Sequence, residues 1–151
     1  MLPFQRILCP TDFSEPACNA IRSAVEMAQH FDAELIIHHV VGAIPAIESP
    51  TGLTNFDLPA YQRELNSAAE ESLKTRLVKY VPDTVNARTL VTHGDAAHEI
   101  VRVAEEEDVD LIVLSTHGAT GWRHLIFGSV AEKVVKLAKC KVLTVYSKPP
   151  D

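Results

Sequence analysis

The chain has 151 residues, of which 46% are hydrophobic and 23% are charged, and its formal net charge is −6 at pH 7. This length fits one domain over residues 1–151 with a substantial core, and the composition argues against disorder and against a membrane partner or span. The acidic balance and the dispersed basic residues disfavour a nucleic acid as the main partner, because binding a phosphate backbone requires clustered Lys and Arg.

Short apolar runs alternate with helical patterns along the chain, which indicates an α/β fold with a parallel sheet and helices on its faces. The first strand is predicted at Arg6–Pro10, and the helix after it begins at the N-cap Ser14 and continues to Phe31. A second strand follows at Leu35–Val41. Gly42–Pro59 is rich in turn-forming residues and has no period, so we expect a long, mobile connection there.

The second half of the chain continues the alternation. A surface helix is predicted from its apolar stripe of Leu65, Ala68, Ala69, Leu73 and Leu77. The helix after the third strand has Asp95 as its expected N-cap. The elements predicted in this half are, in order, the helix Tyr61–Tyr80, the strand Val85–Thr92, the helix Ala96–Glu107, the strand Val109–Ser115, the helix Ser129–Ala138 and the strand Lys141–Tyr146.

The run from Leu111 to Val135 has the pattern of an anion site: a buried strand, a glycine-bearing loop, and a helix that opens on Gly128 and Ser129. A helix start has unpaired backbone N–H groups and a partial positive charge, so phosphate oxygens fit there. Gly128 allows close approach of a ligand, and the Ser129 hydroxyl can accept from the helix N–H groups or donate to a phosphate. The alternative is a plain connection with a helix cap. No Lys follows Gly128, so the run is not a P-loop.

The same run resembles the nucleotide-binding signature of the universal stress protein family, which is glycine, two residues, glycine, nine residues, glycine, then serine or threonine. In this chain Ser115 stands in place of the first glycine, and Gly118 and Gly128 with its following serine match the rest. The family's opening strand and helix are similar to ILCPTDFSEPACNAIRSAV, in which Pro10–Asp12 ends the strand. The resemblance covers nearly the whole chain.

This resemblance implies a five-stranded parallel sheet of order 3-2-1-4-5 with helices on both faces, the adenine nucleotide α-hydrolase-like fold. It implies a regulatory stress-response protein whose ligand is ATP with Mg²⁺, or ADP or AMP. In such a sheet, ligands bind beyond the carboxyl ends of the strands, where the strand order reverses. The residues implied to contact the nucleotide are Pro10, Thr11, Asp12, Val40, Leu114, Ser115, Gly118, Gly128, Ser129 and Val130.

The family pattern also implies individual roles. Asp12 is expected to accept hydrogen bonds from the ribose hydroxyls, although it could instead cap the turn into the first helix, as Ser14 could. The backbone of Val40 is expected to meet the adenine edge. Ser115 adds a Cβ where the family has glycine, so we expect an adjusted site that is not closed. Replacing Gly128 with valine is expected to remove ATP binding while the ligand-free fold loses little.

No combination of residues stands out as a catalytic nucleophile with its base, so fast turnover is not expected. Two rival functions stay open at this point. One is a slow ATPase or nucleotide-processing enzyme that uses His117 or His124 near the phosphates, and the other is a dimeric interaction module with an empty cleft. The seven histidines do not have the spacing of a zinc site, so no metal is predicted apart from magnesium carried by phosphates.

The cysteines and the N-terminus bear on the compartment. Cys9, Cys18 and Cys140 are odd in number and scattered, so we expect reduced core thiols. The N-terminus lacks a basic region followed by a long apolar stretch, and a cytoplasmic location is therefore expected.

The fifth strand bears on assembly. Lys141–Tyr146 would lie at a sheet edge and contains no proline, and members of the family commonly dimerise through this strand, so the resemblance implies a homodimer. The alternative is a monomer in which Lys141 and the Pro149-Pro150 tail shield the edge. Trp122 and the apolar residues 125–127 could form a helical turn packed on the domain, or a contact between subunits.

Overall fold

Strands and helices alternate along the chain in the computed structural model, which describes residues 2–44, 57–117 and 127–147. The four pairings of neighbouring strands are all parallel and give the order β3-β2-β1-β4-β5, which confirms the expected sheet. Within those ranges, no helix has the length and apolar character needed to cross a membrane. The elements are β1 (Arg6–Pro10), α1 (Glu15–Phe31), β2 (Glu34–Val41), α2 (Leu58–Tyr80), β3 (Ala87–His93), α3 (Ala96–Glu106), β4 (Leu111–Ser115), α4 (Ser129–Leu137) and β5 (Lys141–Val145).

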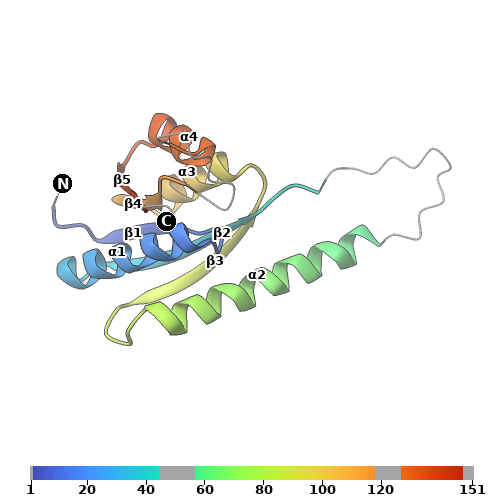
Figure 1. Cartoon of the computed structure of the whole chain (residues 1–151), viewed down its shortest axis with the longest axis horizontal. Coiled ribbons are helices and arrows are strands. Elements are labelled where there is room, and N and C mark those ends of the chain that lie inside the picture. Colours follow the sequence, from blue (N-terminus) through green and yellow to red (C-terminus); the bar gives the residue numbers. More distant parts are fainter. Residues whose placement is uncertain (1, 45–56, 118–126, 148–151) are drawn as a thin grey trace.

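Helices cover both faces of the sheet, with α1 and α2 on one face and α3 and α4 on the other (Figure 1). Strand residues alternate between the two layers. Ile7 and Leu35, which are paired in register, pack toward α1, whereas Leu8 and Ile36, the next pair, pack toward α3. The central strands are therefore buried on both sides, which is why they read as continuous apolar runs.

Helix α2 begins earlier than expected. It starts at Leu58, and the Asp57 carboxylate caps it by accepting from the Ala60 N–H at 3.0 Å. Pro59 lies in the first turn, where its fixed φ is favourable and its missing N–H costs nothing. The prediction that the connection extends through Pro59 was therefore wrong at its C-terminal end, and residues 45–56 lie outside the described ranges.

Strands β3 and β4 each begin two residues later than predicted, because the preceding valines belong to turns. The Val85 N–H donates to the Pro82 carbonyl at 3.0 Å, and the Val109 N–H donates to the Ala104 carbonyl at 2.9 Å. Asp108 adopts a left-handed conformation with a φ of 50°, which turns the chain from α3 back toward the sheet. Both valines are buried, and burial beneath a turn produces the same sequence signal as burial in a strand.

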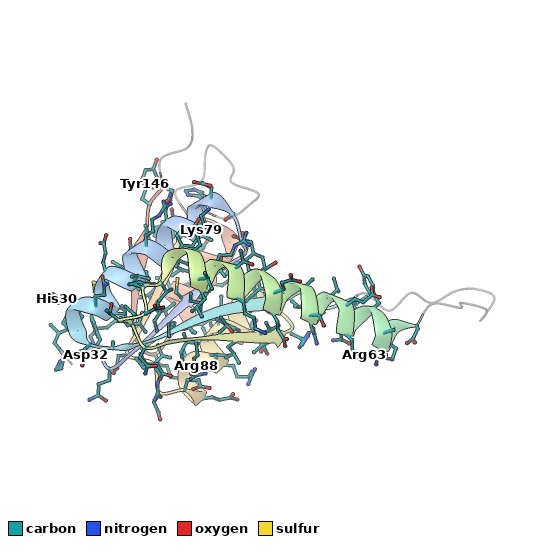
Figure 2. All side chains as sticks on the ribbon, turned by 90° about the horizontal axis from the view of Figure 1, so that it is seen from below. His30, Asp32, Arg63, Lys79, Arg88 and Tyr146 are labelled. Atoms are coloured by element: carbon teal, nitrogen blue, oxygen red, sulfur yellow. The ribbon has the colours of Figure 1, made fainter. Side chains whose placement is uncertain are left out.

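One end of α2 extends past the sheet, as Figures 1 and 2 show, and the projecting end includes Arg63. Along this helix only Ala69 and Leu73 are buried. Ala68 is exposed, so its placement on the apolar stripe was wrong. The helix docks through the half that covers β2 and β3.

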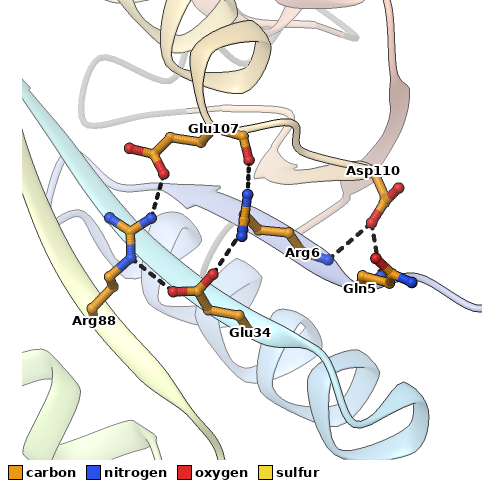
Figure 3. A network of polar contacts seen from close by, with 6 residues as sticks. All are labelled: Gln5, Arg6, Glu34, Arg88, Glu107 and Asp110. Carbon is orange, nitrogen blue, oxygen red and sulfur yellow. Dashed lines mark hydrogen bonds and ion pairs between the residues drawn. The ribbon is translucent and has the colours of Figure 1, made fainter.

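A polar network ties together the amino ends of the strands (Figure 3). The Glu34 carboxylate accepts from Arg88 Nε at 2.8 Å and from Arg6 Nε at 2.7 Å, and Arg88 also pairs with Glu107. The hydrogen bond from Arg88, joined by the one from Arg6, holds the pKa of Glu34 below its ordinary value although partial burial opposes this. Asp110 accepts from the backbone N–H of Arg6 at 2.9 Å. The network braces the edge opposite to the strands' carboxyl ends.

The cysteines are free thiols. Cys9 and Cys18 are buried as expected, whereas Cys140 is only half-buried. Burial, together with the neighbouring Cys18, raises the pKa of the Cys9 thiol to about 12, and burial also raises the pKa of Cys140. Because the thiolate is the reactive form, these two thiols are poor nucleophiles at neutral pH.

Candidate functional site

A cavity of about 220 Å³ opens at the carboxyl edge of the sheet. Strand β1 pairs with β2 on one side and with β4 on the other, so the connections that follow β1 and β4 lead to opposite faces and leave a gap between them. Gly118, one of the expected site residues, lies outside the described ranges. The other expected residues all line this cavity: Pro10, Thr11, Asp12, Val40, Leu114, Ser115, Gly128, Ser129 and Val130.

Several further residues line the cavity that the sequence did not single out. Val40 and Leu114 form part of a packed apolar cluster with Ile100 of α3 and Ala131 of α4, and this cluster makes one wall. Ile100 reaches the cavity because α3 crosses the sheet beside β2, and sequence spacing alone does not reveal this. His38 of β2 also lines the cavity. Its place could have been inferred from the sequence, because His38 and Val40 are two residues apart on one strand and therefore share a face.

Asp12 takes part in the turn from β1 into α1. Its Oδ1 accepts from the Ser14 backbone N–H at 3.0 Å and from the Ser14 hydroxyl at 2.5 Å. Ser14 is the N-cap of α1, as expected, and its Oγ accepts from the Ala17 N–H at 3.3 Å. The carboxylate therefore has a structural role in this turn, and it also borders the cavity.

The residue after Asp12 holds this turn in place. Phe13 has a left-handed backbone with a φ of 67°, which is uncommon for a residue other than glycine. Its ring stacks on His39 with centroids 4.4 Å apart. The guanidinium of Arg76, a residue of α2, lies 4.8 Å from the centroid of the Phe13 ring. His39 Nδ1–H donates to the Thr11 carbonyl at 2.7 Å. Contacts from β2 and α2 thus support the turn that carries Asp12.

Helix α4 starts beside the cavity, and no side chain of the described residues caps it. Gly128 is the N-cap residue, its N–H donates to the Thr116 carbonyl at 2.5 Å, and its carbonyl accepts from the Glu132 N–H at 3.0 Å. Ser129 is the first helical residue, and the N-cap position before it is a glycine, so no side-chain cap bond is formed at that position within the described ranges. Among the described residues, no side chain caps the first N–H groups of α4, which suits a ligand or water as their partner.

Gly128 is required for a steric reason. A Cβ added there would lie 2.9 Å from the Thr116 carbonyl oxygen and 3.6 Å from the His117 Cα. Because these neighbours are backbone atoms, they cannot turn aside as a flexible side chain would. The expectation that the ligand-free fold would tolerate valine at Gly128 was therefore wrong.

Ser115 fits its position without closing the cavity. It lies in the regular part of β4, paired with Val145, where an extended backbone suits a serine as well as a glycine. Its hydroxyl donates to the His117 carbonyl at 2.7 Å, so it is engaged within the connection after β4.

Few formal charges lie in the cavity wall. Among the described lining residues, the only carboxylate belongs to Asp12, and none is Lys or Arg. The α4 start contributes a partial charge of roughly +0.5. Within the described ranges, no three His, Cys, Asp or Glu side chains gather as metal ligands. His124 lies outside these ranges. A bound polyphosphate would therefore bring its own cation.

The strand order, the helices on both faces and the cavity at the strand-order reversal define an open α/β protein of the adenine nucleotide α-hydrolase-like class. The chain belongs to the universal stress protein family, whose model matches residues 3–146.

Three relatives illustrate the match. Universal stress protein MJ0531 from Methanocaldococcus jannaschii is 36% identical, over 94% of this chain and 82% of the relative. The solved structure of universal stress protein UspA from Lactobacillus plantarum has a TM-score of 0.78 at 27% identity, covering 96% of this chain and 99% of that one. A universal stress protein solved in complex with cAMP shares the fold, with a TM-score of 0.65 at 20% identity and coverage of 95% and 97%.

Proposed function

We propose that this protein binds ATP with Mg²⁺, or a related adenine nucleotide, as a regulatory ligand in the cavity at the carboxyl edge of the sheet. One observation carries the proposal: the start of α4, which no described side chain caps, and the Asp12 carboxylate border the same cavity from opposite sides of the strand-order reversal. Backbone N–H groups at a helix start suit phosphates, and a carboxylate suits the paired hydroxyls of a ribose.

The cavity wall suggests how the ligand lies. The flat, apolar base fits against the wall formed by Val40, Ile100 and Leu114. With the ribose at Asp12, the phosphates extend to Gly128 and the first turn of α4. Magnesium balances the phosphate charge, because the described lining has no Lys or Arg to do so. The relative solved with cAMP holds an adenine nucleotide on the same fold.

Slow hydrolysis is the second candidate, and His117 favours it because this histidine lines the cavity close to the α4 start. Its Nδ1 is 2.9 Å from the Thr116 hydroxyl, so the ring is already engaged by a neighbour. We infer a binding role, and expect phosphate release from Mg-ATP to stay near the uncatalysed rate. Release that falls in a His117→Ala variant would instead establish the enzyme.

The first expected result is that the purified protein carries an adenine nucleotide, which mass spectrometry detects after denaturation, and that it binds Mg-ATP in a calorimetric titration. A ligand specific for the folded state raises the free energy of unfolding, by about 2.7 kcal/mol at a concentration of 100 Kd. Removing Mg²⁺ with a chelator is expected to weaken the binding of ATP more than the binding of AMP. A protein with no bound nucleotide and no heat of binding would contradict the proposal and favour an interaction module with an empty cleft.

We also propose a homodimer through β5. This strand is an edge of the sheet, and Leu143 within it and Tyr146 just after it are exposed. The Val145 carbonyl accepts from the Thr116 N–H at 3.0 Å, so Val145 faces the β4 side. Because backbone groups alternate along a strand, the N–H of Thr144 faces the open edge. Two such edges can pair about a two-fold axis.

Replacing Thr144 with proline is therefore expected to remove an outward donor and shift the dimer to monomer, while the pairing of β5 with β4 persists. Thr144→Val, which keeps the N–H, is the matched control and should stay dimeric. Light scattering over a concentration series measures both. A monomeric wild type, or a proline variant that dimerises as tightly as the valine variant, would exclude this edge as the interface.

A further inference from the structure

Phe13 has a backbone conformation that its own side chain does not favour. Its φ of 67° lies in the left-handed region, where residues with a Cβ are sparsely found. Such a conformation persists only when the surrounding structure holds it in place. Phe13 lies between Asp12, which borders the cavity, and Ser14, the N-cap of α1. The contacts that hold Phe13 therefore also orient the Asp12 carboxylate.

Two groups from other elements hold the Phe13 side chain. From β2, the His39 ring stacks on it, with centroids 4.4 Å apart and planes inclined by 28°. His39 is itself fixed, because its Nδ1–H donates to the Thr11 carbonyl at 2.7 Å. From α2, the Arg76 guanidinium lies over the Phe13 ring, 4.8 Å from its centroid. The ring thus links a turn at the cavity to a helix that contributes none of the described lining residues.

The docking of α2 places Arg76 over the ring. Leu73, nearly one turn earlier, is fully buried, and Leu77, the next residue, packs against the same apolar cluster as Phe13. The guanidinium is positively charged at neutral pH. A cation over the face of an aromatic ring is attracted by the negative face of the ring. This attraction favours the placement of Phe13 in which its ring lies under the guanidinium.

We infer that Arg76 is a positioning residue of the ligand site: through the Phe13 ring, it holds the turn that presents the Asp12 carboxylate to the ligand. The inference rests on the proposed nucleotide function, and in particular on the ribose contact of Asp12. It adds that the affinity is set in part from outside the cavity wall, by a helix whose other end extends past the sheet (Figure 2).

The expected effect on affinity follows from pre-organisation. A carboxylate that is already held in its binding direction loses little freedom when the ligand arrives, whereas one in a loose turn must be ordered at the expense of binding. Loss of the Arg76 cation removes one contact of the Phe13 ring and leaves the stack with His39 in place. The turn should therefore persist but orient Asp12 less strictly. Only ligands that bond to Asp12 should bind more weakly.

The test compares Mg-ATP with Mg-dideoxy-ATP, the analogue without the two ribose hydroxyls, by calorimetry in the wild type, Arg76→Gln and Arg63→Gln. Glutamine keeps a good helix propensity without the charge. The wild type is expected to prefer ATP by about 10-fold or more. Arg76→Gln should reduce this preference by about 3-fold, through weaker binding of ATP alone. Arg63→Gln, on the projecting end of α2, is the matched control and should keep the wild-type ratio.

A double-mutant cycle tests the route through the ring. If Arg76 acts through Phe13, its loss should matter only while the aromatic ring is present. Phe13→Leu keeps an apolar side chain but removes the aromatic face, so it should lower the preference for ATP at least as much as Arg76→Gln does. Adding Arg76→Gln to Phe13→Leu should then change nothing further. Losses that add in the double variant would overturn the inference.

The outcomes separate the inference from the function on which it rests. An equal loss of ATP and dideoxy-ATP binding in Arg76→Gln, or no loss of either, would overturn the inference and leave nucleotide binding in place. A wild type that binds both nucleotides equally well would also overturn the inference, because it would remove the ribose contact through which Arg76 acts. A wild type that binds neither nucleotide would overturn the proposed function, and the inference with it.

Discussion

Replacing Gly128 with valine is expected to lower the free energy of unfolding by about 1–3 kcal/mol, the usual cost of forcing extra volume into packed structure. The new Cβ would lie 2.9 Å from the Thr116 carbonyl oxygen, which accepts the Gly128 N–H, so the turn that starts α4 must shift. Because that turn positions the first N–H groups of α4, Mg-ATP should no longer stabilise the variant. Urea unfolding with and without Mg-ATP measures both effects.

Gly42→Val is the matched control for this substitution. A Cβ added at Gly42 meets no atom of the described residues within 4 Å, so the same change in side chain is expected to leave both stability and ATP binding close to the wild type. Equal unfolding midpoints for the two variants would contradict the steric account of Gly128. Full ATP binding by Gly128→Val would show that the phosphates do not lie at the start of α4.

Replacing Asp12 with alanine is expected to lower the affinity for ATP and for ADP by the same factor. The factor corresponds to about 1–3 kcal/mol, the loss of a charge-assisted hydrogen bond. The equality follows from a ribose contact, which both nucleotides share. A contact with the γ-phosphate or with its magnesium ion would penalise ATP selectively. Titration calorimetry with each nucleotide measures the two factors, and a loss confined to ATP would refute the ribose role.

Asp12 also accepts from Ser14 in the turn into α1, so this structural contact needs its own control. Ser14→Ala removes the hydroxyl, which both contacts Asp12 and caps the start of α1, but it keeps the Asp12 carboxylate. It is expected to cost about 0.5–2 kcal/mol of stability with little change in nucleotide affinity. If Ser14→Ala weakens binding as much as Asp12→Ala does, Asp12 acts by shaping the turn and not by contacting the ligand.

The elements that were predicted well are those whose signals are local. Ser14 and Asp95 cap their helices as expected, because an N-cap side chain bonds to N–H groups only a few residues away. The buried strands were recognisable as apolar runs. Where the ends were wrong, as at Val85 and Val109, a buried valine lies in a turn, and the sequence pattern does not distinguish the two cases.

The sequence by itself determined the alternation of strands and helices, the resemblance to the universal stress proteins and most of the residues that border the cavity, because these depend on periodicity and on short motifs. Only the tertiary structure decided which groups face one another across elements far apart in the chain. Ile100 reaches the cavity from α3, and the His38 ring of β2 lies 2.8 Å from the Thr92 hydroxyl of β3. Such contacts depend on how separate elements pack against one another, and no spacing along the chain encodes them.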